Sequence, residues 1–169
     1  MTVKELEQKR LAALFDKQAG KYAQRRRKQS FDLNWRRKLL QNAKGRILEV
    51  AVGAGVNFQF YPKSVEVTAV DLSSVMLEEA KKAAAEHGIQ SDFIASDIEA
   101  LTFPPASFDT VISTLALCAY PNPVRVLNHF NRWCKEDGSV LLLEHGISSS
   151  RPIAWLQNKI DPWQVKKLG

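Results

Sequence analysis

A short apolar run that leads directly into a glycine turn is the feature that most constrains the fold of this chain. Residues 46–50 (Arg-Ile-Leu-Glu-Val) are typical of a buried strand, and Gly53 and Gly55 follow at once. A second apolar run, residues 67–70, ends in Asp71, sixteen residues after Gly55. Parallel strands joined by a crossover bring both strand ends to one edge of a sheet. We therefore expect the glycine turn and Asp71 to lie side by side at the carboxyl edge of an open α/β sheet.

The spacing of these residues indicates the kind of ligand that this edge takes. Open α/β sheets bind nucleoside-containing ligands there, and a carboxylate about 20 residues beyond the turn can accept hydrogen bonds from ribose hydroxyls. A dinucleotide turn needs a third glycine, where this chain has Phe58. The sequence therefore argues against a dinucleotide. Asp71 could instead only cap the following helix, but its place directly after Val70 favours ribose binding.

The pattern Glu-x-Ala-x-Gly-x-Gly, from Glu49 to Gly55, resembles the glycine loop of class I S-adenosylmethionine-dependent methyltransferases, with Ala51 in place of the first glycine. Three further segments resemble later motifs of that family, in the same order: residues 91–98, 108–114 and 133–144. The likeness extends over roughly residues 44–161. Short segments at 57–62, 114–118, 144–146 and 161–163 look like the ubiquinone-biosynthesis-like (type 11) branch, and within it like microsomal and mitochondrial methyltransferase-like proteins.

This resemblance implies a Rossmann-like, doubly wound parallel sheet with strand order 3-2-1-4-5, and S-adenosylmethionine as the cofactor. Asp97 would receive the adenine amino group, and the backbone of Ile98 would meet the ring. A lone buried carboxylate is costly without a partner, so Glu49 would bind either the cofactor ammonium or amides of the glycine loop. The implied cofactor-binding residues are Glu49, Ala51, Gly53, Gly55, Asp71, Leu72, Asp97, Ile98 and Thr114.

The glycines Gly53 and Gly55 would hold the backbone close to the cofactor. On this reading, Gly55→Val removes cofactor binding and leaves the fold largely intact.

The methyl acceptor implied by the resemblance is a small lipophilic molecule, such as a thiol or a quinone precursor. His145 is the candidate substrate contact, since it follows the fifth strand at the ligand-binding edge. Apart from His145 and Glu144, the sequence offers no evident general base. The alternative is a non-catalytic methyltransferase-fold binding or assembly protein, with association with RNA or a ribonucleoprotein as one form of it. The Ala51 substitution and the end of the sequence at Gly169 favour this alternative.

Positive charge is concentrated at the start of the chain. Residues 1–46 carry a net charge of +10, whereas residues 47–169 carry −4. We therefore divide the chain into a basic helical lid region, residues 1–44, and an S-adenosylmethionine-binding domain, residues 45–169. The resemblance places Tyr22 of the lid near the methionine end of the cofactor. Four residues, Arg25, Arg26, Arg27 and Lys28, could contact RNA phosphates or an anionic membrane surface; a solvated helix face is the simpler interpretation.

Local signals fix several helix ends. Ser73 or Ser74 is expected to cap a helix that Gly88 ends, and Asn122 followed by Pro123 is expected to start another. Cys118 is expected to face the core. No run of eighteen apolar residues predicts a membrane span. The three histidines and two cysteines form no metal-ligand cluster. We expect an intracellular protein, mitochondrial or membrane-associated by resemblance.

The sequence after the predicted fifth strand, residues 140–144, is short for the resembled family. Family members continue with a helix and two further strands that cover the fifth. Residues 152–160 can form the helix, but only nine residues follow. We therefore expect either a fragment of a longer protein or a protein partner that covers the exposed apolar edge of strand five.

Overall fold

Five parallel strands form the centre of the computed structural model, which describes residues 3–26, 28, 32–146 and 149–151. Their order in the sheet is β3-β2-β1-β4-β5, which confirms the expected topology. The strands are β1 (Arg46–Val50), β2 (Glu66–Asp71), β3 (Gln90–Ala95), β4 (Phe108–Thr114) and β5 (Cys134–Leu143). The helices are α1 (Val3–Arg26), α2 (Leu33–Leu40), α3 (Ser74–His87) and α4 (Pro123–Trp133), with short 3-10 helices η1 (Val56–Phe60), η2 (Ile98–Ala100) and η3 (Leu117–Ala119).

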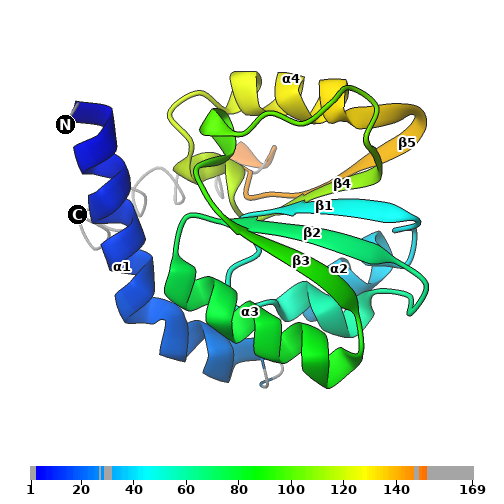
Figure 1. The fold of residues 1–169 in the computed structure, drawn as a ribbon, viewed down its shortest axis with the longest axis horizontal. Coiled ribbons are helices and arrows are strands. Elements are labelled where there is room, and N and C mark those ends of the chain that lie inside the picture. The colour runs from blue at the N-terminus through cyan, green and yellow to red at the C-terminus, as the bar shows by residue number, and fades with distance from the viewer. Residues whose placement is uncertain (1–2, 27, 29–31, 147–148, 152–169) are drawn as a thin grey trace.

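Helices cover both faces of the sheet, so its central strands are apolar on both sides. In Figure 1, α4 lies on one face, α2 and α3 lie on the other, and α1 lies at the carboxyl ends of the strands. Neighbouring residues alternate between two cores. Ile47 and Ile112 pack on the side of α3, whereas Leu48 and Val111 pack on the side of α4 against Trp133. Within the described residues, no helix is both long and apolar enough to span a bilayer.

The predicted helix ends are confirmed. The Ser73 hydroxyl accepts a hydrogen bond from the Met76 N–H at 3.0 Å, and Gly88, at φ 60°, ends the same helix α3. The Asn122 side chain accepts from the Arg125 N–H at 3.0 Å, with Pro123 in the first turn of α4. α3 connects β2 to β3, and α4 connects β4 to β5. The caps at Ser73 and Asn122 therefore fix where the chain leaves the carboxyl edge of the sheet.

The fifth strand differs from its prediction. β5 begins at Cys134, six residues before the predicted start at residue 140. A register shift separates its Phe108–Cys134 and Thr110–Ser139 pairs with β4. Among the described residues β5 pairs with β4 alone. Val140 and Leu142 are 38% and 39% exposed, as expected for an uncovered apolar strand. The helix predicted at residues 152–160 lies outside the described residues.

Cys118 is wrongly predicted as a core residue. It lies in η3, in the connection between β4 and α4, and its side chain is exposed. Its surroundings in the sequence are apolar, but a short 3-10 turn presents successive side chains in different directions. The packing of η3 on the core is left to Leu117.

Gly55 has a packing role that its sequence motif does not reveal. Its φ is +78°, and a Cβ atom there would lie 2.8 Å from the Ala83 Cβ and 3.0 Å from the Ala80 Cα of α3. The turn and the helix therefore touch at Gly55. The expectation that Gly55→Val leaves the fold intact is wrong, because the larger side chain would push α3 away.

Replacing each glycine of the turn by alanine separates the cost of backbone strain from the cost of a steric clash with α3. Gly53 has a similar φ of +55°, but its Cβ would meet nothing within 4 Å. Both alanines carry the strain of a left-handed backbone, about 1–2 kcal/mol. Only Gly55→Ala adds a clash with α3, about 1–3 kcal/mol more. Urea denaturation should therefore show a larger loss of unfolding free energy for Gly55→Ala; an equal loss in the two variants contradicts the packing role.

Candidate functional site

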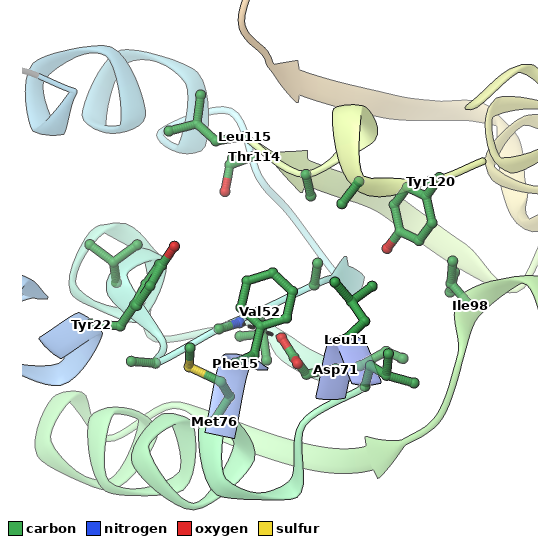
Figure 2. Close-up of a pocket in the computed structure, with 18 of the residues that line it drawn as sticks. Leu11, Phe15, Tyr22, Val52, Asp71, Met76, Ile98, Thr114, Leu115 and Tyr120 are labelled. Atoms are coloured by element: carbon green, nitrogen blue, oxygen red, sulfur yellow. Dashed lines mark hydrogen bonds between the residues drawn. The ribbon is translucent and has the colours of Figure 1, made fainter. Parts of the chain in front are cut away.

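A cavity of about 520 Å³ lies at the carboxyl edge of the sheet, between α1 and the loops that follow β1, β2 and β4. Figure 2 shows Leu11, Phe15 and Tyr22 of α1 at this cavity, with Thr114 and Tyr120 across from them. Most of the residues predicted to bind a ligand line it: Ala51, Gly53, Asp71, Leu72, Asp97, Ile98, Thr114 and His145. Two predicted residues, Glu49 and Gly55, are not among its lining residues.

Asp71 connects the glycine turn to the end of β2. One carboxylate oxygen accepts the Gly53 N–H at 2.8 Å, and the other accepts the Ser73 N–H at 2.9 Å. Burial raises the pKa of Asp71, and these hydrogen bonds partly oppose that rise. Asp71 therefore supports the helix start, as the capping alternative held, and also lines the cavity. The Leu72 N–H also bonds this carboxylate, whose roughly four acceptor sites still leave room for a ligand hydroxyl.

The first position of the glycine loop explains why the resembled family has glycine there. Ala51 has a φ of +52°, in the left-handed region. A side chain in this conformation carries backbone strain, which glycine avoids. Ala51 keeps the turn in the glycine-like conformation in spite of its methyl group.

Asp97 brings α1 into contact with the end of β3. Its Oδ1 accepts the Glu99 N–H at 3.0 Å, and its Oδ2 accepts a hydrogen bond from the Gln8 side chain of α1. Asp97 is thus both the N-cap of η2 and part of the cavity wall. Gln8 was not expected at the site from sequence, because nothing local links residues 8 and 97.

Two further contacts hold α1 on the sheet edge. The guanidinium of Arg26 is buried and donates to the carbonyl oxygens of Ala54 and Glu79, both at 2.9 Å. The Ser73 hydroxyl donates to Asp16 at 2.5 Å. The prediction of Arg26 as a solvent-facing or phosphate-binding residue is wrong, since its donors are used inside the protein.

The rest of the basic run is divided between the surface and the undescribed part of the chain. Arg25 and Lys28 are exposed, and the Arg25 guanidinium lies over the Tyr22 ring, 5.9 Å from its centroid. Arg27 lies outside the described residues.

Glu49 has protein partners in place of the expected ligand ammonium or loop amides. Its two oxygens accept from the Asn57 side-chain amide at 2.8 Å and the Tyr61 hydroxyl at 2.7 Å. Burial is the main cause that raises the pKa of Glu49 to about 7, and these two hydrogen bonds oppose it. Glu49 therefore lies behind the cavity wall and anchors η1 against β1.

Arg36 is a buried cation at the cavity wall that sequence analysis did not identify. Its Nε donates to Asp32 at 2.6 Å, and its Nη1 donates to the Asn57 Oδ1 and the Thr114 Oγ1, both at 2.7 Å. Asn57 thereby links Arg36 to Glu49. The spacing of Asp32 and Arg36, four residues apart on one helical turn, was the only local signal for this pair.

Glu144 is not a free general base. Its carboxylate accepts the Ser113 hydroxyl at 2.9 Å and the N–H groups of Ala116 and Leu117 at 3.0 and 3.2 Å. Glu144 therefore shapes the loop after β4, where Leu115 has a φ of +57°. His145 remains at the cavity as a candidate substrate contact.

The arrangement suits an organic ligand that is part polar and part apolar. Carboxylates from Asp71 and Asp97 lie at the ends of β2 and β3, while α1 adds apolar and aromatic side chains. A volume of this size is typical of small-molecule sites. Burial and the nearby acidic groups raise the pKa of Tyr120, so its hydroxyl stays protonated as a neutral donor.

Comparison with known proteins shows which family the chain belongs to. The family description "Methyltransferase domain" matches residues 47–138, more than half of the chain. The chain is 32% identical over 118 residues to a phosphatidylethanolamine N-methyltransferase of Cereibacter sphaeroides, a match that covers 69% of this chain and 58% of that protein. It is 35% identical over 102 residues to thiol S-methyltransferase TMT1B of Rattus norvegicus, covering 59% and 42%.

The chain thus spans less than two thirds of the length of either relative. A solved structure, Haemonchus contortus phosphoethanolamine N-methyltransferase 1 in complex with phosphoethanolamine and S-adenosylhomocysteine, superposes with a TM-score of 0.69. The identity is 18%, and the superposition covers 89% of this chain and 34% of that one. The chain therefore belongs to the methyltransferase-domain family and has the Rossmann-like fold of the class I S-adenosylmethionine-dependent methyltransferases.

Proposed function

We propose that the cavity binds S-adenosylmethionine and that the chain transfers its methyl group to a small acceptor. The observation that carries this proposal is the position of Asp71, which ends β2 beside the glycine turn and lines the cavity. A nucleoside needs such an acceptor for its ribose hydroxyls. The complex of the Haemonchus enzyme with S-adenosylhomocysteine supports the same cofactor class.

The residues of the cavity take the following roles in this proposal. Asp71 and Leu72 hold the ribose, Asp97 and Ile98 meet the adenine, and the turn around Gly53 faces the amino acid end. The Gln8 side chain of α1 donates to the Oδ2 of Asp97. The adenine amino group would therefore either displace Gln8 or donate to the same oxygen alongside it.

The cofactor, when bound, supplies an electrophilic sulfonium methyl group. The chain's contribution is then to orient the acceptor and to exclude water, which can lower the barrier substantially without acid–base chemistry. The aromatic and apolar side chains of α1 are suited to exclude water, because they lie over the cavity between the turn and the loop after β4.

We propose a small acceptor with an apolar part. Leu33, Leu115 and Tyr120 give the cavity wall an apolar surface, and His145 is the candidate polar contact. The two curated relatives are named for a phospholipid and for thiols, which are acceptors with this mixed character.

Removing the charge of Asp71 tests the cofactor site. Asp71→Asn should weaken the binding of S-adenosylhomocysteine by about 1.5–3 kcal/mol, the contribution of hydrogen bonds to a charged group. Glu66→Gln is the matched control, since Glu66 is exposed at the opposite end of the same strand. Isothermal titration calorimetry gives both affinities. Parental affinity in Asp71→Asn would mean that Asp71 serves only the turn and the helix start.

The alternative is a non-catalytic binding or assembly protein that keeps the methyltransferase fold. The specific observation in its favour is the strained Ala51 in the loop where the family has glycine. The same titration discriminates between the two proposals. Binding of S-adenosylhomocysteine by the parent supports the enzyme, whereas no binding supports the scaffold.

We also propose that the outer face of α1 binds an anionic membrane surface, which fits a mitochondrial or membrane-associated protein. Exposed cations lie along this helix and just beyond it: Lys9, Arg10, Lys17, Lys21, Arg25 and Lys28. Such a cluster attracts phosphates at low salt.

Reversing three of these charges tests the surface. The triple variant Lys17→Glu, Lys21→Glu and Lys28→Glu should lose binding to vesicles of anionic phospholipid in co-sedimentation at low salt. The triple variant Lys63→Glu, Lys81→Glu and Lys82→Glu, at exposed positions outside α1, is the control with the same change in net charge. If the parent binds RNA but no vesicles, RNA is the partner; if it binds neither, the face is only solvated.

A further inference from the structure

Arg36 is the cavity residue with the least obvious purpose. The whole residue is 6% exposed, yet it lines the cavity beside Leu33 and Thr114. A buried charge is costly unless it is paired and hydrogen-bonded. The hydrogen-bond partners of its N–H groups therefore show which of them can still bind a ligand.

Three of its five N–H groups have partners. A guanidinium carries one hydrogen on Nε and two on each terminal nitrogen. The Nε donates to Asp32, and Nη1 donates to both Asn57 and Thr114. Within the described part of the chain, Nη2 makes no hydrogen bond. Since Arg36 lines the cavity, Nη2 is the guanidinium nitrogen that remains for a ligand there.

The partners of Arg36 hold the guanidinium in one orientation. The Asn57 amide cannot rotate freely, because its Nδ2 donates to Glu49 while its Oδ1 accepts from Arg36. Thr114 ends β4, and Asp32 precedes α2, so anchors come from three separate segments. A fixed planar fork loses little entropy when it binds a carboxylate or a phosphate.

The other described cations at the cavity are differently placed. Arg26 donates to two backbone carbonyls and pairs with Glu86 at 3.3 Å. Arg25 is exposed, with its guanidinium over the Tyr22 ring. Each of the two buried arginines keeps one nitrogen without a hydrogen bond among the described residues, Nε in Arg26 and Nη2 in Arg36. Only Nη2 of Arg36 is a terminal nitrogen, with two N–H groups to offer a ligand.

We propose that Arg36 binds the α-carboxylate of the cofactor through its free terminal nitrogen, an inference that rests on the cofactor proposed above. A carboxylate favours a cation as its partner, and Asp71 and Asp97 cannot supply one. Arg36 reaches the cavity beside Thr114, at the end of β4, whereas Asp71 and Asp97 lie at the ends of β2 and β3. The Asp32 carboxylate also lines the cavity, but it accepts from the Nε of Arg36 and leaves Nη2 to face a ligand. A zwitterionic ligand with a nucleoside at one end and an anion at the other matches this division of charge.

Two nucleosides that differ only in the carboxylate test the proposal. Calorimetry should be run with S-adenosylhomocysteine and with its decarboxylated analogue, on the parent and on Arg36→Gln. The parent should bind S-adenosylhomocysteine more tightly. Arg36→Gln should lose about 10- to 100-fold in affinity for S-adenosylhomocysteine, as expected for a charge-assisted hydrogen bond. Its affinity for the decarboxylated analogue should change less than about threefold, within the usual variation between unrelated sites.

Arg36→Lys guards against a purely structural effect. It keeps the positive charge near the cavity but offers a single point of contact, so it should retain part of the preference for the carboxylate. Thermal unfolding of both variants reports whether the Asp32–Asn57–Thr114 network survives. If Arg36→Gln does not fold, the preference in Arg36→Lys decides: an unchanged preference overturns the proposal.

The remaining outcomes separate this inference from the proposed function. Equal losses for both ligands in Arg36→Gln would overturn the carboxylate contact and leave Arg36 as a support of the cavity wall. Equal affinity of the parent for both ligands would also overturn it, and would point to an anionic group on the acceptor. A parent that binds neither nucleoside contradicts the proposed cofactor itself.

Discussion

The hydrogen bonds of Asp71 fix the geometry on which the site depends. Its carboxylate joins the N–H of Gly53, in the turn after β1, to the N–H of Ser73, at the start of α3. A carboxylate held between two backbone donors gives strong, charge-assisted hydrogen bonds. The turn, the end of β2 and the helix start are thereby one unit. Since the cavity is built on these three segments, its floor is fixed before any ligand arrives.

The first helix converts this edge of the sheet into a cavity. α1 contacts the edge through polar groups that span its length: Gln8 on Asp97, Asp16 on Ser73 and Arg26 on the Ala54 carbonyl. Apolar residues between these contacts, Phe15 and Ala19 among them, pack around Met76 and Ala54. α1 is therefore held on the sheet edge by hydrogen bonds spaced along its length together with a small apolar cluster.

The parts of the structure that sequence could predict are those that depend on local chemistry. The alternation of strands and helices predicted a parallel sheet, and the family resemblance supplied its strand order. The caps at Ser73, Gly88 and Asn122 depend on residues next to each helix. Asp71 was predicted because it ends an apolar run at the expected distance from the glycine turn, and Asp97 because the resembled family has an acid after its third strand. The positions of Gly55, Arg26 and Arg36 could not be predicted in this way. Apart from Asp32, four residues before Arg36, the partners of the two arginines are 21 to 78 residues distant, so only the packed fold brings them together.

The central claim is that the cavity under α1 is where the cofactor binds. Hydrogen–deuterium exchange of the full chain with and without S-adenosylhomocysteine tests it most directly, because backbone amides report the site without any substitution. The account predicts slower exchange in the turn at residues 51–55, at residues 71–73, at residues 97–99 and along α1, with little change at the opposite edge of the sheet. Unchanged exchange in these segments at saturating ligand, or slower exchange confined to another surface, would contradict it.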